Sequence, residues 1–462
     1  MLSRSMLRGW SPGRWFLLGA LALGACQPPS VQRELSLMET VDELRLRDDV
    51  RALVALGPRM GGTVSGERAA EWRAGQFATA GLTVRVLEDP AKWCHEEGLW
   101  SVAVEVNGAL EDLESAQPWG FSPPGKGAGI LSTEPKRGTV LLAERLPGAE
   151  ERSGVLAALI EGSTTPDGRY PLARDQNRER APGFPVFGLS DPDAARLRSL
   201  ADEVEGLRVR FSLDTLVREA SPSTVEARLA PAAGAPAGFL LICAHGDSDS
   251  GGPGANDNGS GEAIVLELAR RWAQAVQSGQ LPAPPREVRF AIWGSEIHSS
   301  RAYLDAHAAD LLGVINFDQS GFGSTAERLY VEPDDLAFNG ELVGAFAEVM
   351  DEHASTPYLP EEWATVRSQG GTDSYIFSDA EIPAVTIYTS AWNRLGSHEP
   401  TPGMPGASWT SKGPIEIDFD NFYHSAGDTP ENTTDREPWN MAWCVRAGWL
   451  TALRWLDGLG SP

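Results

Sequence analysis

The sequence predicts an α/β protein with a mixed central sheet and helices on both faces. Short, largely apolar runs at 239–244, 288–293 and 314–317 suit strands that are buried on both faces of a parallel sheet. The segment after the first run carries apolar residues at every fourth position from Ile264 to Val276, which predicts an amphipathic helix. Each run also ends near a histidine or a carboxylate, which predicts a polar site at one edge of the sheet.

These polar residues suggest a metal site. The carboxyl ends of the strands form the ligand crevice in open α/β sheets. Imidazole and carboxylate ligands without thiolate suit zinc or a similar divalent ion, and several of them together suit catalysis. A single histidine or the Asn256–Gly259 turn would be weak support, because Asn and Asp are common in plain turns. The recurrence across the chain carries the prediction, at His245, Asp247, Asp257, Glu296, Asp318 and His424.

Five motifs carry a family resemblance. AHGDS, PGANDNGSG, WGSE, NFDQSG and YHSAGDTPEN occur in this order, and together they resemble the metal and catalytic motifs of the M28 zinc peptidases. The resemblance spans roughly residues 238–432, with weaker similarity back to Leu37, including Pro58–Gly62. It implies a phosphorylase/hydrolase-like α/β fold and hydrolysis of a terminal bond in a peptide substrate. The family contains aminopeptidases and carboxypeptidases, of which aminopeptidases are the commoner.

The resemblance also implies a role for each motif residue. Two divalent metal ions are expected, most simply Zn²⁺, although cobalt and manganese accept the same ligands. His245 and Asp318 would bind one ion, His424 would bind the other, and Asp257 would bridge them. Asp247 would be a catalytic-site residue that orients the His245 ring. The peptide bond between Asp257 and Asn258 would be cis.

Glu296 marks a departure from the family pattern. The family has two adjacent glutamates here, the first a general base and the second a metal ligand, whereas Glu296 is followed by Ile297 and a shorter loop. Counted from the preceding strand, Glu296 takes the position of the base. Counted back from the following helix, it takes the position of the ligand, so both roles stay open. His298 is an alternative ligand, although its position also suits a solvent-facing side chain.

Asp373 and Tyr375 are candidate substrate-binding residues. They precede the predicted strand 382–388, and the corresponding region of the family lines the substrate pocket. Asp373 suits a helix cap equally well.

The length of 462 residues predicts more than one domain. We expect a signal peptide (1–25), a tether (26–35), the first part of the peptidase domain (36–100), an insert (101–219) and the catalytic part (220–462). The insert has short strand-like runs at 139–143, 154–160, 184–189 and 207–212 and one helix candidate at 194–204. This β-rich pattern is similar to a protease-associated domain. Residues 223–229 should then form an edge strand.

The N-terminal segment predicts export. Arg4, Arg8 and Arg14 precede an apolar stretch at 15–25, which is shorter than the ~20 residues of a membrane span and typical of a signal peptide. Its end, Leu23–Cys26, resembles a bacterial lipobox. We expect cleavage before Cys26, lipidation of Cys26 and anchoring to the cell envelope, with Gln27 favouring the outer membrane. An ordinary cleaved signal is the alternative.

The charge balance argues against nucleic acid as a partner. The chain has 64 acidic and 39 basic Lys and Arg residues, a net charge of −25, and no basic cluster, whereas proteins that read nucleic acid present a basic surface.

The sequence leaves three other functions open. A carboxypeptidase would need a cationic clamp, for which Arg301, Arg367 and Arg394 are candidates. A receptor-like binding protein on the peptidase fold would fit the single glutamate but would not need the four other ligands. A single-zinc acyltransferase such as a glutaminyl cyclase would not need both His245 and Asp318.

Overall fold

The computed structural model describes residues 29–148, 150–172, 183–248, 252–323, 328–354, 356–367, 370–390 and 420–459. The expected signal peptide (1–25) and Cys26 lie outside these ranges, as does Arg394. Within them, no helix combines the length and the apolar character that a membrane span requires.

The central sheet is mixed, as predicted. Its strand order is β1 (Thr83–Glu88), β10 (Ser223–Leu229), β12 (Glu287–Trp293), β11 (Phe239–His245), β13 (Leu311–Phe317), β16 (Ala384–Tyr388), β14 (Arg328–Glu332) and β15 (Glu362–Thr365). The four strands from β12 to β16 are parallel to one another. β10 is antiparallel to both of its neighbours. The expectation that 223–229 is an edge strand is therefore wrong, because β1, which precedes the insert in sequence, pairs along its outer side.

Helices cover both faces of this sheet. They are α1 (Pro29–Met38), α2 (Glu43–Val54), α3 (Val64–Thr79), α5 (Gly261–Gln277), α6 (His298–His307), α7 (Gly340–His353), α8 (Asp373–Ser378) and α9 (Trp439–Leu459). Alternate residues of β11 enter different cores: Ile242 packs with α5 and α9, whereas Leu241 packs with α6 and α8. This alternation is the period-2 geometry of a strand buried on both faces.

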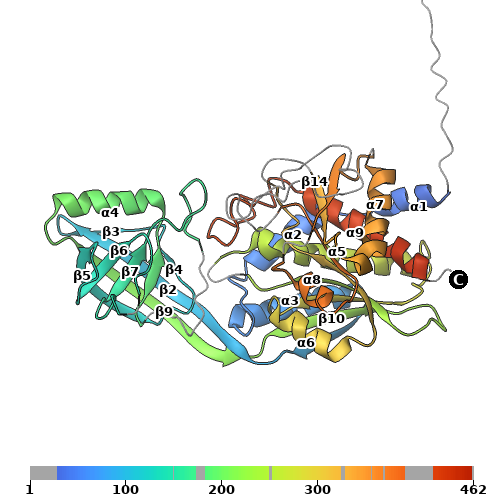
Figure 1. Cartoon of the computed structure of the whole chain (residues 1–462), viewed down its shortest axis with the longest axis horizontal. Helices are drawn as coiled ribbons and strands as arrows, with labels where there is room; N and C mark the ends of the chain where they lie inside the picture. Colours follow the sequence, from blue (N-terminus) through green and yellow to red (C-terminus); the bar gives the residue numbers. More distant parts are fainter. Residues whose placement is uncertain are drawn as a thin grey trace, which may run out of the picture.

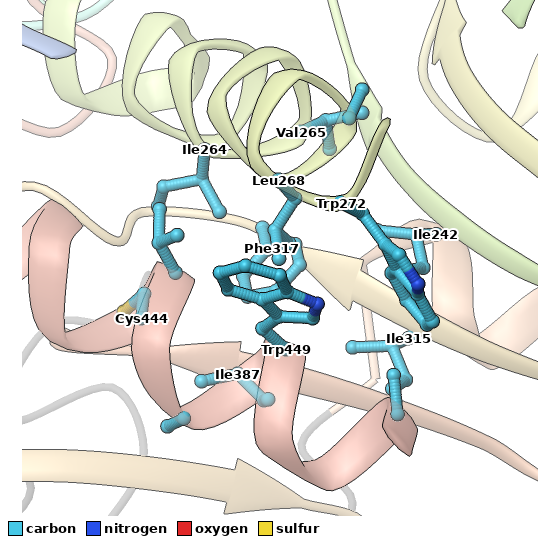
Figure 2. Close-up of a cluster of buried hydrophobic side chains, with 14 of the residues drawn as sticks. Ile242, Ile264, Val265, Leu268, Trp272, Ile315, Phe317, Ile387, Cys444 and Trp449 are labelled. Atoms are coloured by element: carbon cyan, nitrogen blue, oxygen red, sulfur yellow. The ribbon is translucent and has the colours of Figure 1, made fainter. Parts of the chain in front are cut away.

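The larger core confirms the predicted helix face. Ile264, Leu268 and Trp272 of α5 are fully buried. Figure 2 shows them in one cluster with Phe317 at the end of β13 and with Trp449 and Cys444 of α9. This packing fixes the sheet edge from which the candidate ligands emerge.

The expected tether is wrong for residues 29–35, because they belong to α1. Val31 and Leu37 of this helix are buried in the main body. Glu34 is bonded to Arg454 of α9, with 2.7 Å between Oε2 and Nη2. Its apolar face and its ion pair with Arg454 hold this segment on the main body as a helix.

The insert forms a second sheet. Its order is β3 (Ala109–Asp112), β2 (Lys92–Val106), β9 (Arg208–Ala220), β5 (Gly125–Ser132), β6 (Thr139–Ala143), β7 (Ala157–Ile160), β8 (Val186–Gly188) and β4 (Gln117–Pro118), with α4 (Asp191–Glu203) packed on it. In Figure 1 this sheet is a separate lobe joined to the main body through the long strands β2 and β9. Since β2 and β9 pair from Lys92 and Ala220 onward, the expected boundary at residue 101 falls inside β2.

Candidate active site

Three neighbouring strands deliver the first group of candidate ligands. His245 is the last residue of β11, Asp318 directly follows β13, and Glu296 lies in the turn after β12. Because these strands are parallel and adjacent, their carboxyl ends meet at one edge of the sheet. The ligand atoms of His245, Glu296 and Asp318 lie within 4.8 Å of one another.

Asp257 links this group to His424. Its Oδ1 lies 3.2 Å from Nε2 of His245, and its Oδ2 lies 3.0 Å from Nε2 of His424. One carboxylate therefore faces two imidazoles that come from distant segments. The Asp257–Asn258 peptide bond is cis, as predicted.

Asp247 supports both His245 and Glu296. Its Oδ1 lies 3.3 Å from Nδ1 of His245 and accepts the backbone N–H of Glu296 at 2.8 Å. With Nδ1 facing Asp247, the Nε2 atom of His245 faces Asp257 and Asp318, the latter at 3.5 Å. The contact thus sets the orientation of the imidazole, as carboxylates do for ligating histidines.

The segment that carries His424 also holds the Asp257 loop. Asp428 accepts the backbone N–H groups of Asn256 and Asp257 at 2.8 and 2.9 Å. Asp420 accepts the Asn256 side-chain amide at 2.8 Å. These two carboxylates fix the position of Asp257 relative to His424.

Two buried arginines hold the loops that carry His245 and Asp257. Arg59 and Arg73 share Glu262 of α5, with Nε–Oε distances of 3.2 and 2.5 Å. Arg59 donates to the Pro253 and Gly254 carbonyls at 2.8 Å, and Arg73 to the Gly246 carbonyl at 2.5 Å. This cluster is not among the site residues predicted from the sequence. The resemblance of Pro58–Gly62 gave an indirect signal for Arg59, and no pattern indicated Arg73.

The site contains an excess of buried negative charge. Burial and the neighbouring carboxylates, Asp318 above all, raise the pKa of Glu296 well above its usual value against the effect of His245. Burial also raises the pKa of Asp373 to about 7 and of Asp420 to about 6. Burial would lower the pKa of His245, but Glu296 and Asp318 outweigh it and hold that pKa well above its usual value.

This charge fits divalent cations. Oδ1 of Asp318 is buried and 3.5 Å from Nε2 of His245, without a hydrogen bond, and a buried carboxylate oxygen without a hydrogen bond is costly unless a cation or donor meets it. Two imidazoles and several carboxylates without thiolate are ligands that zinc accepts. The residues present therefore fit the metal ions that the resemblance implies.

The other candidates from the sequence lie around this group. Asp373 is fully buried, and its Oδ1 accepts the N–H of Ile297 at 2.8 Å, so it supports the Glu296 turn. Ile297 has φ 59°, which is rare and strained for a β-branched residue. The His298 Nε2 lies 2.7 Å from the Pro90 carbonyl. This contact holds the His298 ring away from the group of candidate ligands. Tyr375 on α8 is 42% exposed.

A second group of similar composition has its own cation. Ligand atoms of Glu34, Glu352 and His353 also lie within 4.8 Å of one another. However, Arg454 contacts Glu34 at 3.0 and 2.7 Å and Glu352 at 2.5 Å. A guanidinium of the chain already pairs with both carboxylates, so the group is an ion-pair cluster of the fold.

Comparisons with known proteins agree with this geometry. Peptidase family M28 matches residues 224–448. The chain is 30% identical over 210 residues to leupeptin-inactivating enzyme 1 of Streptomyces exfoliatus, which covers 44% of this chain and 42% of that protein. It is 30% identical over 259 residues to a probable lipoprotein aminopeptidase of Mycobacterium tuberculosis, covering 54% of this chain and 45% of that protein. The chain thus spans less than half the length of these two relatives.

Solved structures share the fold. A zinc aminopeptidase from Bacillus subtilis aligns with a TM-score of 0.60 at 19% identity, covering 89% of this chain and 96% of that one. A peptidase M28 precursor from Shewanella amazonensis aligns with a TM-score of 0.65 at 17% identity, covering 92% and 96%. With the motifs at one sheet edge and the family match across residues 224–448, the chain carries a peptidase domain of family M28.

Proposed function

We propose that the protein is an aminopeptidase that uses two divalent metal ions, most simply Zn²⁺, to hydrolyse the N-terminal bond of a peptide. The observation that carries the proposal is the Asp257 carboxylate, which faces His245 with one oxygen and His424 with the other. The family match and the aminopeptidase relatives support the same reaction class.

Each ligand residue has a defined part in this proposal. His245 and Asp318 would hold one ion, His424 the other, and Asp257 both. Ions bound there supply positive charge that acidifies a water molecule and polarises the peptide carbonyl. Asp247 keeps the Nε2 atom of His245 directed at the ligand group.

Glu296 is proposed as the general base. It would take a proton from the attacking water and deliver it to the leaving amine, a role that typically contributes about 10² to 10⁴ in rate. Burial raises the pKa of its carboxyl group well above the usual value, which suits a group that must hold a proton between the two steps. The Asp247 and Asp373 contacts to residues 296 and 297 fix its turn.

The aminopeptidase assignment over carboxypeptidase rests on two points. Several relatives, including the Mycobacterium tuberculosis protein, are named as aminopeptidases, and the acidic surroundings of the site suit a substrate ammonium group better than a carboxylate. Of the two substrate-binding candidates we retain Tyr375, because it is partly exposed whereas Asp373 is fully buried.

We also propose that the insert is a protease-associated domain and that the protein is exported and anchored through a lipid on Cys26, with the outer membrane as the expected location. The β-rich fold of the insert and a relative named as a probable lipoprotein aminopeptidase support these assignments. Labelled fatty acid should be incorporated into the wild-type protein and should not be incorporated into a Cys26→Ser variant. Equal labelling of the two would refute lipidation at Cys26.

The test of the activity is metal content per chain measured beside hydrolysis of aminoacyl nitroanilides, with and without chelator. We expect two ions per chain and release that stops on chelation. Hydrolysis of carboxy-terminal substrates alone would replace the aminopeptidase by a carboxypeptidase. Absence of both metal and turnover would favour a receptor-like protein.

A further inference from the structure

We propose that a hairpin of the insert, residues 163–172, positions the candidate metal ligand His424. The inference rests on the proposed function, because it assigns the hairpin a role in metal binding. The contact joins the insert to the catalytic part, and its residues are not among the site residues predicted from the sequence.

His424 differs from the other ligands in its surroundings. Its side chain is 36% exposed, whereas those of His245 and Asp318 are 6% and 5% exposed. It lies in a segment of turns between residues 420 and 438 and has φ 49°, a conformation that few non-glycine residues adopt. His424 lies outside the strands of the central sheet, so its position depends on contacts within its own segment, such as the stacked ring of Tyr423, and on contacts from neighbouring segments.

The hairpin is held together by its own hydrogen bonds. The backbone N–H of Leu172 donates to the Ser163 carbonyl, and that of Thr165 donates to the Tyr170 carbonyl, both at 2.8 Å. The Thr165 hydroxyl donates to Asp167 at 2.7 Å. The hairpin therefore has a defined shape to present to a neighbour.

This hairpin contacts the His424 segment through its backbone. Leu172 forms an antiparallel bridge with Ser425, the residue after His424. The N–H of Ala426 donates to the Pro171 carbonyl at 3.4 Å. The chain that carries His424 is thus paired with the insert immediately after the ligand.

Tyr170 adds side-chain contacts on both sides of His424. Its ring packs edge-on against Phe422 with 6.0 Å between centroids, and its hydroxyl accepts the Asn432 amide at 3.3 Å. A Cβ atom on Gly427 would lie 2.6 Å from Cδ2 of Tyr170, so the ring lies directly on the backbone at that position. Tyr170 is thereby the main positioning residue of the hairpin.

The hairpin contact also affects Asp257, the carboxylate that would hold both ions. The same segment carries Asp428, which accepts the N–H groups of Asn256 and Asp257. A shift of this segment would separate His424 from Asp257, while His245 and Asp318 would stay on their strands. Because Asp257 would contact both ions, loss of the hairpin contact should weaken the ion at His424 most and the ion at His245 and Asp318 less.

The test is a titration of the metal-free, full-length protein with Co²⁺ alone, followed by visible absorption and calorimetry. In Tyr170→Ala we expect the second ion to bind about 10- to 100-fold more weakly, the usual effect of losing a group that orients a ligand, and the first ion to be weakened less. Tyr170→Phe keeps the ring and should stay close to wild type. The matched control is Leu110→Ala, an exposed position on β3 of the insert, which should change neither ion.

Gly427→Ala disturbs the same contact, because its added Cβ atom would clash with the Tyr170 ring. This variant replaces Tyr170→Ala in the test if Tyr170→Ala does not fold. It should likewise weaken the second ion more than the first. Unchanged binding of two ions in both variants would overturn the positioning role and leave the proposed function intact. A wild-type protein that binds no Co²⁺ would instead overturn the proposed function, and with it this inference.

Discussion

Two groups of the same residue types differ in where their positive charge comes from. Glu34, Glu352 and His353 surround Arg454, and Glu34 bonds to it through both oxygens. The ligand atoms of His245, Glu296 and Asp318 also lie within 4.8 Å of one another, but within the described ranges no arginine or lysine is bonded to their side chains. The first group has an arginine of the chain as its cation, whereas the second fits the divalent ions of the proposed function.

The pKa values of Glu34 and Glu296 reflect the same difference between the two groups. Burial would raise the pKa of Glu34, but its bonds to His353 and Arg454 outweigh it and lower that pKa to about 2. Burial raises the pKa of Glu296, and the neighbouring Asp318 and Asp373 raise it further. Glu34 thus has an arginine of the chain beside it, whereas Glu296 lies among other carboxylates, and this crowding makes the Glu296 group the better candidate for metal binding.

The largest expected effect is on catalysis. Glu296→Gln removes the proposed base while keeping the size of the side chain, and kcat/KM for aminoacyl nitroanilides should fall by about 10² to 10⁴. Steady-state kinetics and metal analysis on the same sample check this. Retained metal with lost activity assigns the base role, whereas lost metal would make Glu296 a ligand.

Removing the internal cation of the other group should affect stability instead. Arg454→Met leaves Glu34 buried without its guanidinium, and we expect the free energy of unfolding to fall by about 3 kcal/mol, at the low end for buried pairs because Arg454 is partly exposed. Urea denaturation measures the change. Metal affinity should be unaltered, and a loss of metal here would contradict the division between the two groups.

A smaller effect is expected from Asp247→Asn. The amide keeps the shape but no longer offers a charged acceptor to Nδ1 of His245 or to the N–H of Glu296. Metal affinity should fall by about 10- to 100-fold, as measured by competition with a chelating indicator. An unchanged affinity would show that the backbone carbonyl of Asp247, 3.1 Å from Nδ1, is sufficient to orient the ring.

The smallest effect is a pH dependence. Because the pKa of Glu34 is lowered from 4.5 to about 2 in the folded protein, its stabilisation is complete above pH 4.5 and is lost as the pH falls through about 2. The difference in unfolding free energy between wild type and Glu34→Gln should therefore shrink across this range. Urea midpoints of both proteins over that range test it, and a constant difference would mean that Glu34 stabilises the fold without its charge.

Local patterns were enough to predict the central elements. The apolar runs at 239–244, 288–293 and 314–317 all lie in strands of the central sheet, and the i+4 series from Ile264 defines the buried face of α5. The motif residues could be predicted to lie close together because parallel strands end at a common edge of the sheet. Tyr375 and Asp373 show the limit, since the same short motif contains one exposed and one buried residue.

The sequence by itself thus determined the α/β class, the family resemblance and the chemical types at the site, because strand and helix periods and strand-end motifs extend over only a few residues. Only the tertiary structure decided that α1 packs on α9, that β1 covers β10, and that Arg59 and Arg73 share Glu262. It also placed Tyr170 against the His424 segment. These contacts join residues from about a hundred to several hundred positions apart, and no local period records which distant charge or ring will meet which.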